Sequence, residues 1–214
     1  MTDVRALFVE TALAAQGLLF EPALAERFDK ASALAEFPVR GLAGHLLRAM
    51  TSVEGYLARP EPDRGVGAVS PAEYYAAVAA GGNDIDSDLH RAVRQRGLDE
   101  AAGTAEELAL AWSDTVARLA GRLGSEPPGR LVEVFGDMVL TLDDYLVTRL
   151  VELVVHADDL AASLGVPPPP LPAAATGLVI ATLVEVARIR HGDAAVLRAL
   201  ARRERDAVEA LRVL

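Results

Sequence analysis

The segment from Thr141 to Gly165, TLDDYLVTRLVELVVHADDLAASLG, restricts the fold more than any other part of this chain. Thr141 and Asp144 give it a start that resembles a capping box, and Gly165 before a proline run is a typical end, so one helix is expected. Its interior is mostly Leu, Val and Ala, which indicates a largely buried helix. Five side chains recur at steps of four, three, four and three and therefore share one face: Tyr145, Arg149, Glu152, His156 and Asp159. A buried helix with such a polar face needs partners for it.

The rest of the chain is predicted to be mainly helical, with one short hairpin. LVEVF and MVL, separated by Gly136 and Asp137, resemble two short strands more than a helix. The proline-rich stretch at residues 166–172 is expected to be a stiff extended connector. Periodicity and capping signals predict the other helices at about residues 2–19, 22–34, 38–58, 70–80, 84–101, 104–124, 173–190 and 193 to the end, with Gly81 and Gly82 as a break.

Composition excludes several classes of function. The 214 residues suffice for one substantial core or one domain with a small appendage, and 51% hydrophobic against 24% charged residues indicates a globular chain. A net charge of −10, with no basic cluster to offset it, disfavours binding to nucleic acid. The sequence has neither a secretory signal nor an uncharged run long enough to span a membrane, so a cytoplasmic location is expected. Without cysteine, any thiol chemistry needs a thiol from outside the chain.

Three side chains form a candidate metal site. Glu152 and His156 are one helical turn apart, so they can converge on one point, and their apolar flanks make an unpartnered carboxylate costly. His45, in the apolar segment GLAGHLLRAM, is the natural third ligand. Two imidazoles, a carboxylate and an open position are the donor set of catalytic zinc sites, and they also suit iron or nickel. On the residues alone, a hydrogen-bonded polar network in the core explains the pattern equally well.

Other polar residues have two interpretations each. Asp159 could orient a ligand imidazole, and Arg149 could pair with Glu152 or hold an anionic substrate group. Arg48 has the same two alternatives, and Tyr145 is expected in the core or in a pocket wall. The remaining histidines, His90 and His191, are expected to be structural or exposed to solvent.

With these residues in place, the sequence resembles the mycothiol-dependent maleylpyruvate isomerase family, which belongs to the DinB-like metal-binding helical bundles. The matching stretches are FPVRGLAGHLLRAM, SPAEYYA, the segment from Thr141 to Gly165 and, less specifically, VLRALARRER. A histidine on an early helix followed by Glu-x-x-x-His on a later one agrees with the three metal ligands of that family. The resemblance covers roughly residues 1–165. The family isomerase also has a C-terminal α/β domain, whereas the residues after Gly165 here are predicted to be helical, so maleylpyruvate itself is not expected as the substrate.

The resemblance implies a DinB-like four-helix bundle at residues 1–165. Together with the elements predicted from the residues, this gives a mainly α fold with a short β-hairpin, the proline-rich connector at residues 166–172, and a helical extension at residues 173–214 packed on the bundle. It also implies a divalent metal, zinc before iron or nickel, on His45, Glu152 and His156, with Arg149 and Asp159 as catalytic candidates. The expected partners are a small electrophilic substrate and mycothiol or a similar thiol, and a homodimer is compatible with this. The implied activity is a thiol-dependent S-transferase or isomerase; the alternative is a noncatalytic bundle that binds a metal or small ligand.

Overall fold

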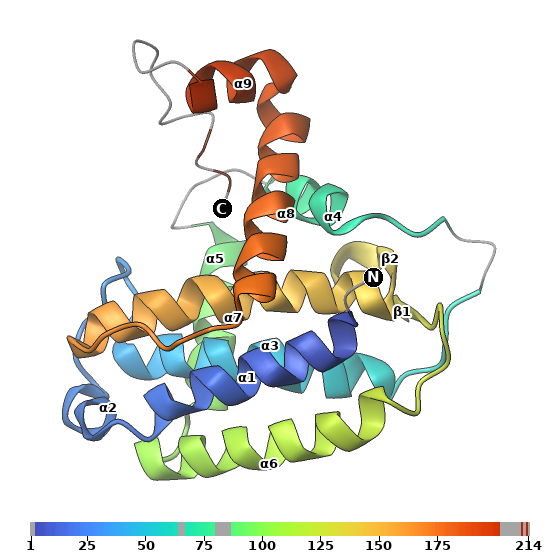
Figure 1. The fold of residues 1–214 in the computed structure, drawn as a ribbon. Helices are drawn as coiled ribbons and strands as arrows, with labels where there is room; N and C mark the ends of the chain where they lie inside the picture. Colours follow the sequence, from blue (N-terminus) through green and yellow to red (C-terminus); the bar gives the residue numbers. More distant parts are fainter. Residues whose placement is uncertain (1–2, 64–66, 80–86, 202–210, 212, 214) are drawn as a thin grey trace.

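The computed structural model describes residues 3–63, 67–79, 87–201, 211 and 213. In these ranges the chain is mainly helical, with one small antiparallel sheet, which confirms the predicted fold class (Figure 1). The elements are, in order, α1 (Val4–Leu19), α2 (Pro22–Arg27), α3 (Val39–Leu57), α4 (Pro71–Ala79), α5 (Asp88–Glu100), α6 (Ala105–Leu123), β1 (Leu131–Glu133), the 3-10 turn η1 (Phe135–Asp137), β2 (Val139–Thr141), α7 (Leu142–Leu164), α8 (Ala173–His191) and α9 (Asp193–Ala201).

Four long helices, α1, α3, α6 and α7, form the bundle. Helix α1 packs against α6 and α7, and α3 packs against the same two helices, so each member has two neighbours. In Figure 1, α1 and α7 run in one direction and α3 and α6 in the other. Their apolar faces meet in one continuous core, in which Trp112 of α6 is fully buried and donates its indole N–H to the Ala12 carbonyl of α1 at 3.2 Å. Burial of these faces, rather than helix propensity, holds such a bundle together.

The helix ends follow the signals in the sequence. Thr104 and Glu107 form a complete capping box at the start of α6. Thr141 accepts a hydrogen bond from the backbone N–H of Asp144 at 3.0 Å, and its hydroxyl donates to the Asp144 carboxylate. Gly165 ends α7 with φ of 73°, a left-handed conformation that a residue without Cβ adopts at little cost. The two caps therefore set the ends of α7, the helix that bears the polar face.

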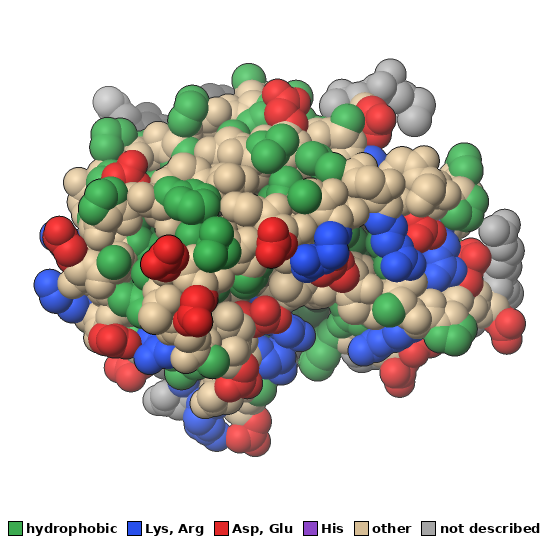
Figure 2. Space-filling view, turned by 90° about the horizontal axis from the view of Figure 1, so that it is seen from below, with side chains coloured by type: hydrophobic (Ala, Val, Ile, Leu, Met, Phe, Trp, Pro, Cys, Tyr) green, Lys and Arg blue, Asp and Glu red, His purple; other side chains and the backbone are tan. Residues whose placement is uncertain are grey.

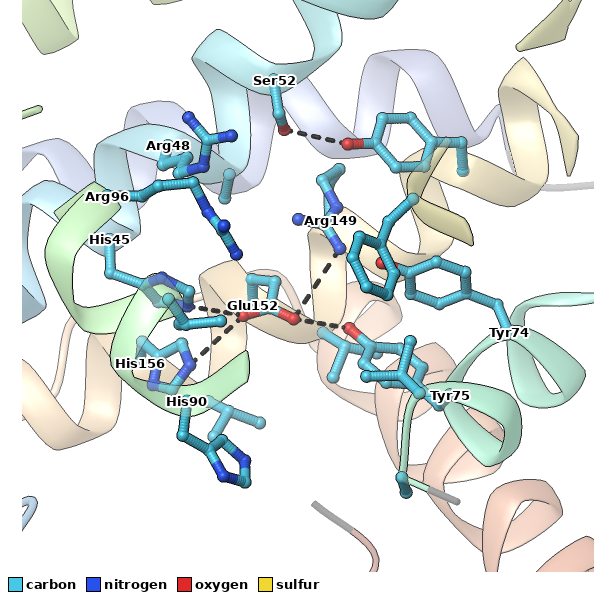
Figure 3. A pocket seen from close by; sticks show the side chains of 18 of the residues that line it. His45, Arg48, Ser52, Tyr74, Tyr75, His90, Arg96, Arg149, Glu152 and His156 are labelled. Atoms are coloured by element: carbon cyan, nitrogen blue, oxygen red, sulfur yellow. Dashed lines mark hydrogen bonds and ion pairs between the residues drawn. The ribbon is translucent and has the colours of Figure 1, made fainter. Parts of the chain in front are cut away.

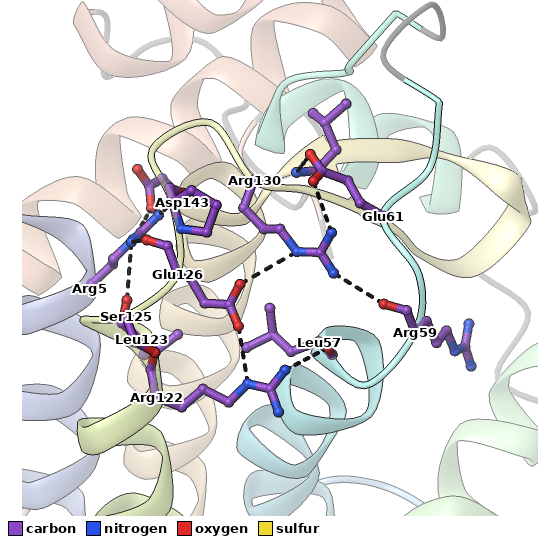
Figure 4. Close-up of polar contacts among 12 residues, drawn as sticks. Arg5, Leu57, Arg59, Glu61, Arg122, Leu123, Ser125, Glu126, Arg130 and Asp143 are labelled. Atoms are coloured by element: carbon purple, nitrogen blue, oxygen red, sulfur yellow. Dashed lines mark hydrogen bonds and ion pairs between the residues drawn. The ribbon is translucent and has the colours of Figure 1, made fainter.

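The hairpin joins α6 to α7 and is fixed to the bundle by arginines (Figure 4). Strand β1 pairs with β2 in the register Leu131 to Thr141. Arg5 of α1 donates to the carbonyls of Leu123 at 3.1 Å and Glu126 at 2.6 Å, where the end of α6 leaves carbonyls without helical partners. Arg130 contacts the carboxylates of Glu61 and Glu126 at 3.2 and 3.5 Å. These contacts set the position at which α7 begins.

The predicted helix at residues 22–34 is shorter than expected, because α2 ends at Arg27. Beyond it the backbone pairs with the approach to α3 instead of continuing the helix: the N–H groups of Val39 and Arg40 donate to the carbonyls of Lys30 and Phe28 at 2.9 and 2.8 Å. The predicted break at Gly81 and Gly82, the helix start at residue 84 and the extension of the last helix past residue 201 lie outside the described residues.

Outside the bundle, α8 packs against α4, α7 and α1, and α9 packs against α8. Figure 1 shows α8 rising steeply from the bundle with α4 beside it. The domain boundary at residues 166–172 remains a prediction. On the face seen from below in Figure 2, acidic, basic and apolar side chains are interspersed. None of the described helices combines the length and the apolar composition that crossing a membrane requires.

Glycines bring α5 unusually close to α3. A methyl group on Gly97 of α5 would lie 2.5 Å from the Gly41 carbonyl of α3 and 3.3 Å from Cβ of His45, and one on Gly44 would collide with the Gly97 carbonyl. The two backbones are therefore in direct contact beside the candidate ligand His45. Only residues without a side chain at Gly44 and Gly97 allow this approach.

We expect Gly97→Ala to lower the free energy of unfolding by about 1–3 kcal/mol, because the added methyl group must push α5 away from α3. Gly121→Ala is the matched control: it also changes a helical glycine, but nothing lies within 4 Å of the new methyl group. That control should raise stability by roughly 0.5–1 kcal/mol through helix propensity. Urea unfolding of both variants measures the difference, and equal stabilisation by the two would contradict the close packing of α3 and α5.

Candidate metal centre

The three predicted ligands meet between α3 and α7. Nε2 of His45 lies 3.0 Å from Oε2 of Glu152, and Nε2 of His156 lies 3.3 Å from the same oxygen. The two imidazole rings are 4.9 Å apart between centroids and meet edge to face. One donor atom from each of the three residues lies within 4.8 Å of the others, so the cluster could hold a metal ion. Figure 3 shows both rings directed at one carboxylate oxygen from the same side, opposite Tyr75 and Arg149.

The second carboxylate oxygen of Glu152 has other neighbours. The hydroxyl of Tyr75, from α4, lies 2.8 Å from Oε1 of Glu152 and 2.8 Å from the Thr148 carbonyl, so its single proton is shared between two acceptors. Nη2 of Arg149 lies 3.8 Å from the same Oε1. The carboxylate is therefore held by the tyrosine and the arginine on one side, with its other oxygen directed at the imidazoles.

Electrostatics keep Glu152 ionised despite its burial. Burial raises the pKa of Glu152, but hydrogen bonds from His156 and His45 and the charge of Arg149 outweigh this and hold the pKa well below its usual value. The pKa of His156 is raised to about 9, because its hydrogen bonds to Asp159 and Glu152 outweigh the opposite effect of burial. In the metal-free protein at neutral pH, His156 is therefore an imidazolium between two carboxylates.

The two histidines are supported differently. Nδ1 of His156 lies 2.9 Å from Oδ2 of Asp159, a contact that holds the ring with Nε2 directed at Glu152. The orienting role of Asp159 at a metal stays a prediction. Nδ1 of His45 is buried and has no hydrogen-bond partner among the residues that the structure describes. Its ring is positioned by packing instead, with Phe37 at 6.0 Å between centroids and His156 on another side. The centre thus has one histidine fixed by a carboxylate and one fixed by its surroundings.

The donor separations suit a small divalent cation. Zinc binds imidazole nitrogen and carboxylate oxygen at about 2.0–2.2 Å, which places neighbouring donors of a tetrahedral site roughly 3.3–3.6 Å apart. The observed separations of 3.0 and 3.3 Å between Glu152 Oε2 and the two histidine nitrogens are close to that spacing. Nitrogen and carboxylate donors without a thiolate also suit iron and nickel. The residues therefore fit a divalent metal.

The cluster lies in the wall of a cavity of about 660 Å³, the size of a small-molecule site. All five members of the polar face of α7 contribute to this wall, as does Arg48 of α3. Tyr145 is buried, and its hydroxyl donates to Ser52 Oγ at 2.9 Å. The Arg149 guanidinium stacks over the Tyr145 ring, 5.0 Å from its centroid. His191 does not line the cavity. It ends α8, and its buried Nε2 finds no hydrogen-bond partner in the described part of the chain.

Three cavity residues were missed or assigned another role from the sequence. His90 was expected to be structural or exposed, yet it lines the same cavity and its Nδ1 lies 3.0 Å from Ser87 Oγ. Tyr75 lies in the matching stretch SPAEYYA, but nothing in that stretch indicates that its hydroxyl meets Glu152. Arg96 is one of several arginines on a charged helix, and only the close packing of α5 on α3 separates it from the others.

Fold and site together define a class: a four-helix bundle in which two imidazoles and one carboxylate, from two of its helices, form a metal-capable cluster beside a cavity. Residues 10–161 match the family model described as the mycothiol maleylpyruvate isomerase N-terminal domain. The chain belongs to this family. Comparison with curated proteins and with solved structures found no significant match.

Asp159→Asn is expected to lower the pKa of His156 from about 9, because the amide can still accept a hydrogen bond but carries no charge. A raised histidine pKa stabilises the fold fully below the ordinary value of 6.5, and the contribution is lost as the pH rises through about 9. Metal-free wild type should therefore exceed the variant in stability more at pH 6 than at pH 10.

NMR titration of the imidazole and urea unfolding at the two pH values measure these effects. Asp158→Asn is the matched control, since it removes the same charge from the neighbouring, exposed residue. An unchanged His156 pKa in Asp159→Asn would show that Glu152 alone stabilises the imidazolium.

Proposed function

We propose that this protein is a metal- and thiol-dependent enzyme, an S-transferase or isomerase that acts on a small electrophilic substrate. The observation that supports the proposal most is the convergence of His45, Glu152 and His156 within 4.8 Å at the wall of a cavity. Membership of the mycothiol maleylpyruvate isomerase N-terminal domain family supports mycothiol, or a similar low-molecular-weight thiol, as cosubstrate. The chain has no cysteine of its own, so an external thiol meets no competing protein thiol.

In this proposal His45, Glu152 and His156 hold a divalent cation, zinc in the first place. Such a cation lowers the pKa of a coordinated thiol and so supplies a thiolate nucleophile at neutral pH. His156 must give up its imidazolium proton before its Nε2 can bind a metal, whereas Glu152 is already ionised. Part of the wall of the same space is apolar and includes Val155.

Asp159 and Arg149 act in this proposal as positioning residues. Asp159 holds Nδ1 of His156, so the proton leaves from Nε2, the atom that faces Glu152. Arg149 is buried between the Tyr145 ring and Glu152, and its pKa is raised despite burial because of those neighbours. It therefore keeps a fixed positive charge beside Oε1 and leaves Oε2 as the donor toward the imidazoles.

The first expectation is that the purified protein takes up about one divalent metal per chain. His45→Ala, Glu152→Ala and His156→Ala should each weaken binding by more than the roughly 10–100-fold that loss of a supporting hydrogen bond costs. Isothermal titration of metal-depleted protein with zinc measures this. His90→Ala and His191→Ala are the controls. A loss of zinc affinity in His90→Ala equal to that of the three ligand variants would show that His90 belongs to the metal site.

The second expectation separates an enzyme from a binding module. Addition of mycothiol, or a simple thiol, to the cobalt-substituted protein should produce sulfur charge-transfer absorption and release a proton near neutral pH, because the thiol binds as thiolate. His156→Ala should lose both responses. A cobalt form that binds metal stoichiometrically but whose spectrum is unchanged by millimolar thiol would refute thiol transfer. The metal would then be structural or serve a reaction with water as nucleophile.

A further inference from the structure

Arg96 of α5 is a cation without a counter-ion in the cavity wall. Within the described parts of the chain it makes no hydrogen bond and no ion pair, although its side chain is partly buried. The other two guanidinium groups of the cavity are engaged: Arg48 lies 3.4 Å from Glu100, and Arg149 lies 3.8 Å from Glu152. Burial and the nearby charge of Arg48 both lower the pKa of Arg96. The fold thus holds the Arg96 charge where burial and a neighbouring positive charge both destabilise it.

Arg48 adds a second positive charge to the same region. Its contact with Glu100 is long, and Glu100 also accepts a hydrogen bond from Thr51 at 2.8 Å, so one carboxylate serves two donors. Figure 3 shows Arg48 and Arg96 on the same side of the cavity, across from Arg149. Two neighbouring guanidinium groups, of which only Arg48 has a carboxylate partner among the described residues, can accept a planar oxyanion. Two-point hydrogen bonding to carboxylate is the geometry that arginine provides.

Another part of the cavity wall consists of aromatic and apolar side chains. Tyr56, Tyr74, Val78 and Val93 line the cavity, and the side chains of Tyr56 and Tyr74 are close enough to Arg96 to influence its pKa. Such a surface binds a hydrocarbon or aromatic body rather than a second charged group. The ligand that fits is therefore an organic acid with one anionic end and an apolar body.

We infer that Arg96, assisted by Arg48, binds the carboxylate of such an apolar organic acid in the cavity. The adjacent residue Gly97 lies against His45, so an acid held by Arg96 has its body in the space beside the metal cluster. That the acid is the electrophilic substrate rests on the proposed function, whereas its binding by Arg96 does not. Among the described residues, the carboxylates of the cavity wall are Asp159 and Glu152. Both are already engaged with His156, so they do not neutralise Arg96.

The test uses two probes of the same shape, 3-phenylpropanoate and its neutral amide, titrated calorimetrically into the full chain with and without zinc. Neither probe can accept a thiol, so binding is measured without reaction. The acid should bind at least about tenfold more tightly than the amide, because it gains charge-assisted hydrogen bonds. Arg96→Gln should remove most of this preference, and Arg48→Gln part of it. Arg91→Gln is the control for overall charge, since Arg91 lies on the same helix but outside the cavity wall and pairs with Asp88.

Two results would overturn the inference. One is equal binding of acid and amide by the wild type. The other is a preference for the acid that survives Arg96→Gln but disappears when zinc is removed, which would make the acid a ligand of the metal. Thermal unfolding of Arg96→Gln checks that the variant is folded. A preference that depends on Arg96 and persists without zinc supports the inference even if the thiol experiment fails, so the two proposals can fail separately.

Discussion

The buried carboxylate of Glu152 is the constraint on which the rest of the site depends. An ionised carboxylate removed from water is costly unless several groups compensate it, and here the compensation comes from three helices: His45 on α3, Tyr75 on α4, and His156 with Arg149 on α7. Loss of any one of these contacts would leave the buried charge less fully compensated. The packing of α4 and α3 against α7 is thereby linked to the protonation and ligation of a single side chain.

The close approach of α5 to α3 shapes the other half of the cavity. Gly44 and Gly97 let the two backbones touch, and this contact places His45 and Arg96 on adjoining parts of one wall. With larger residues at these positions the helices would separate, and the side chains of His45 and Arg96 would both move. The positions of the candidate ligand His45 and of Arg96 are therefore coupled through backbone packing rather than through a hydrogen bond between the two residues.

The local part of this architecture was predictable from sequence, and the long-range part was not. The caps at Thr104, Thr141 and Gly165 and the polar face of α7 depend on spacings of a few residues, which fix their geometry. Tyr75 contributes a hydroxyl from a helix 77 residues away from Glu152, and no spacing rule relates the two. The helix predicted after Pro22 is cut short because Val39 and Arg40 offer backbone donors to that segment, a competition that propensity does not register.

Charge in the cavity wall gives the two proposals a common basis. Three guanidinium groups, of Arg48, Arg96 and Arg149, face two carboxylates, of Glu152 and Asp159, with Glu100 behind Arg48 as a partial partner. In the metal-free protein the imidazolium of His156 adds to the positive side. Exchange of its proton for a divalent cation adds one more positive charge to a space that α3, α5 and α7 already enclose. A cavity with this excess of positive charge stabilises negative charge in its ligands. A thiolate at the metal cluster and a carboxylate at Arg96 would neutralise the positive charge of the wall at two separate points. The electrostatics thus favour a pair of anions, one reactive and one anchoring, over a single neutral ligand.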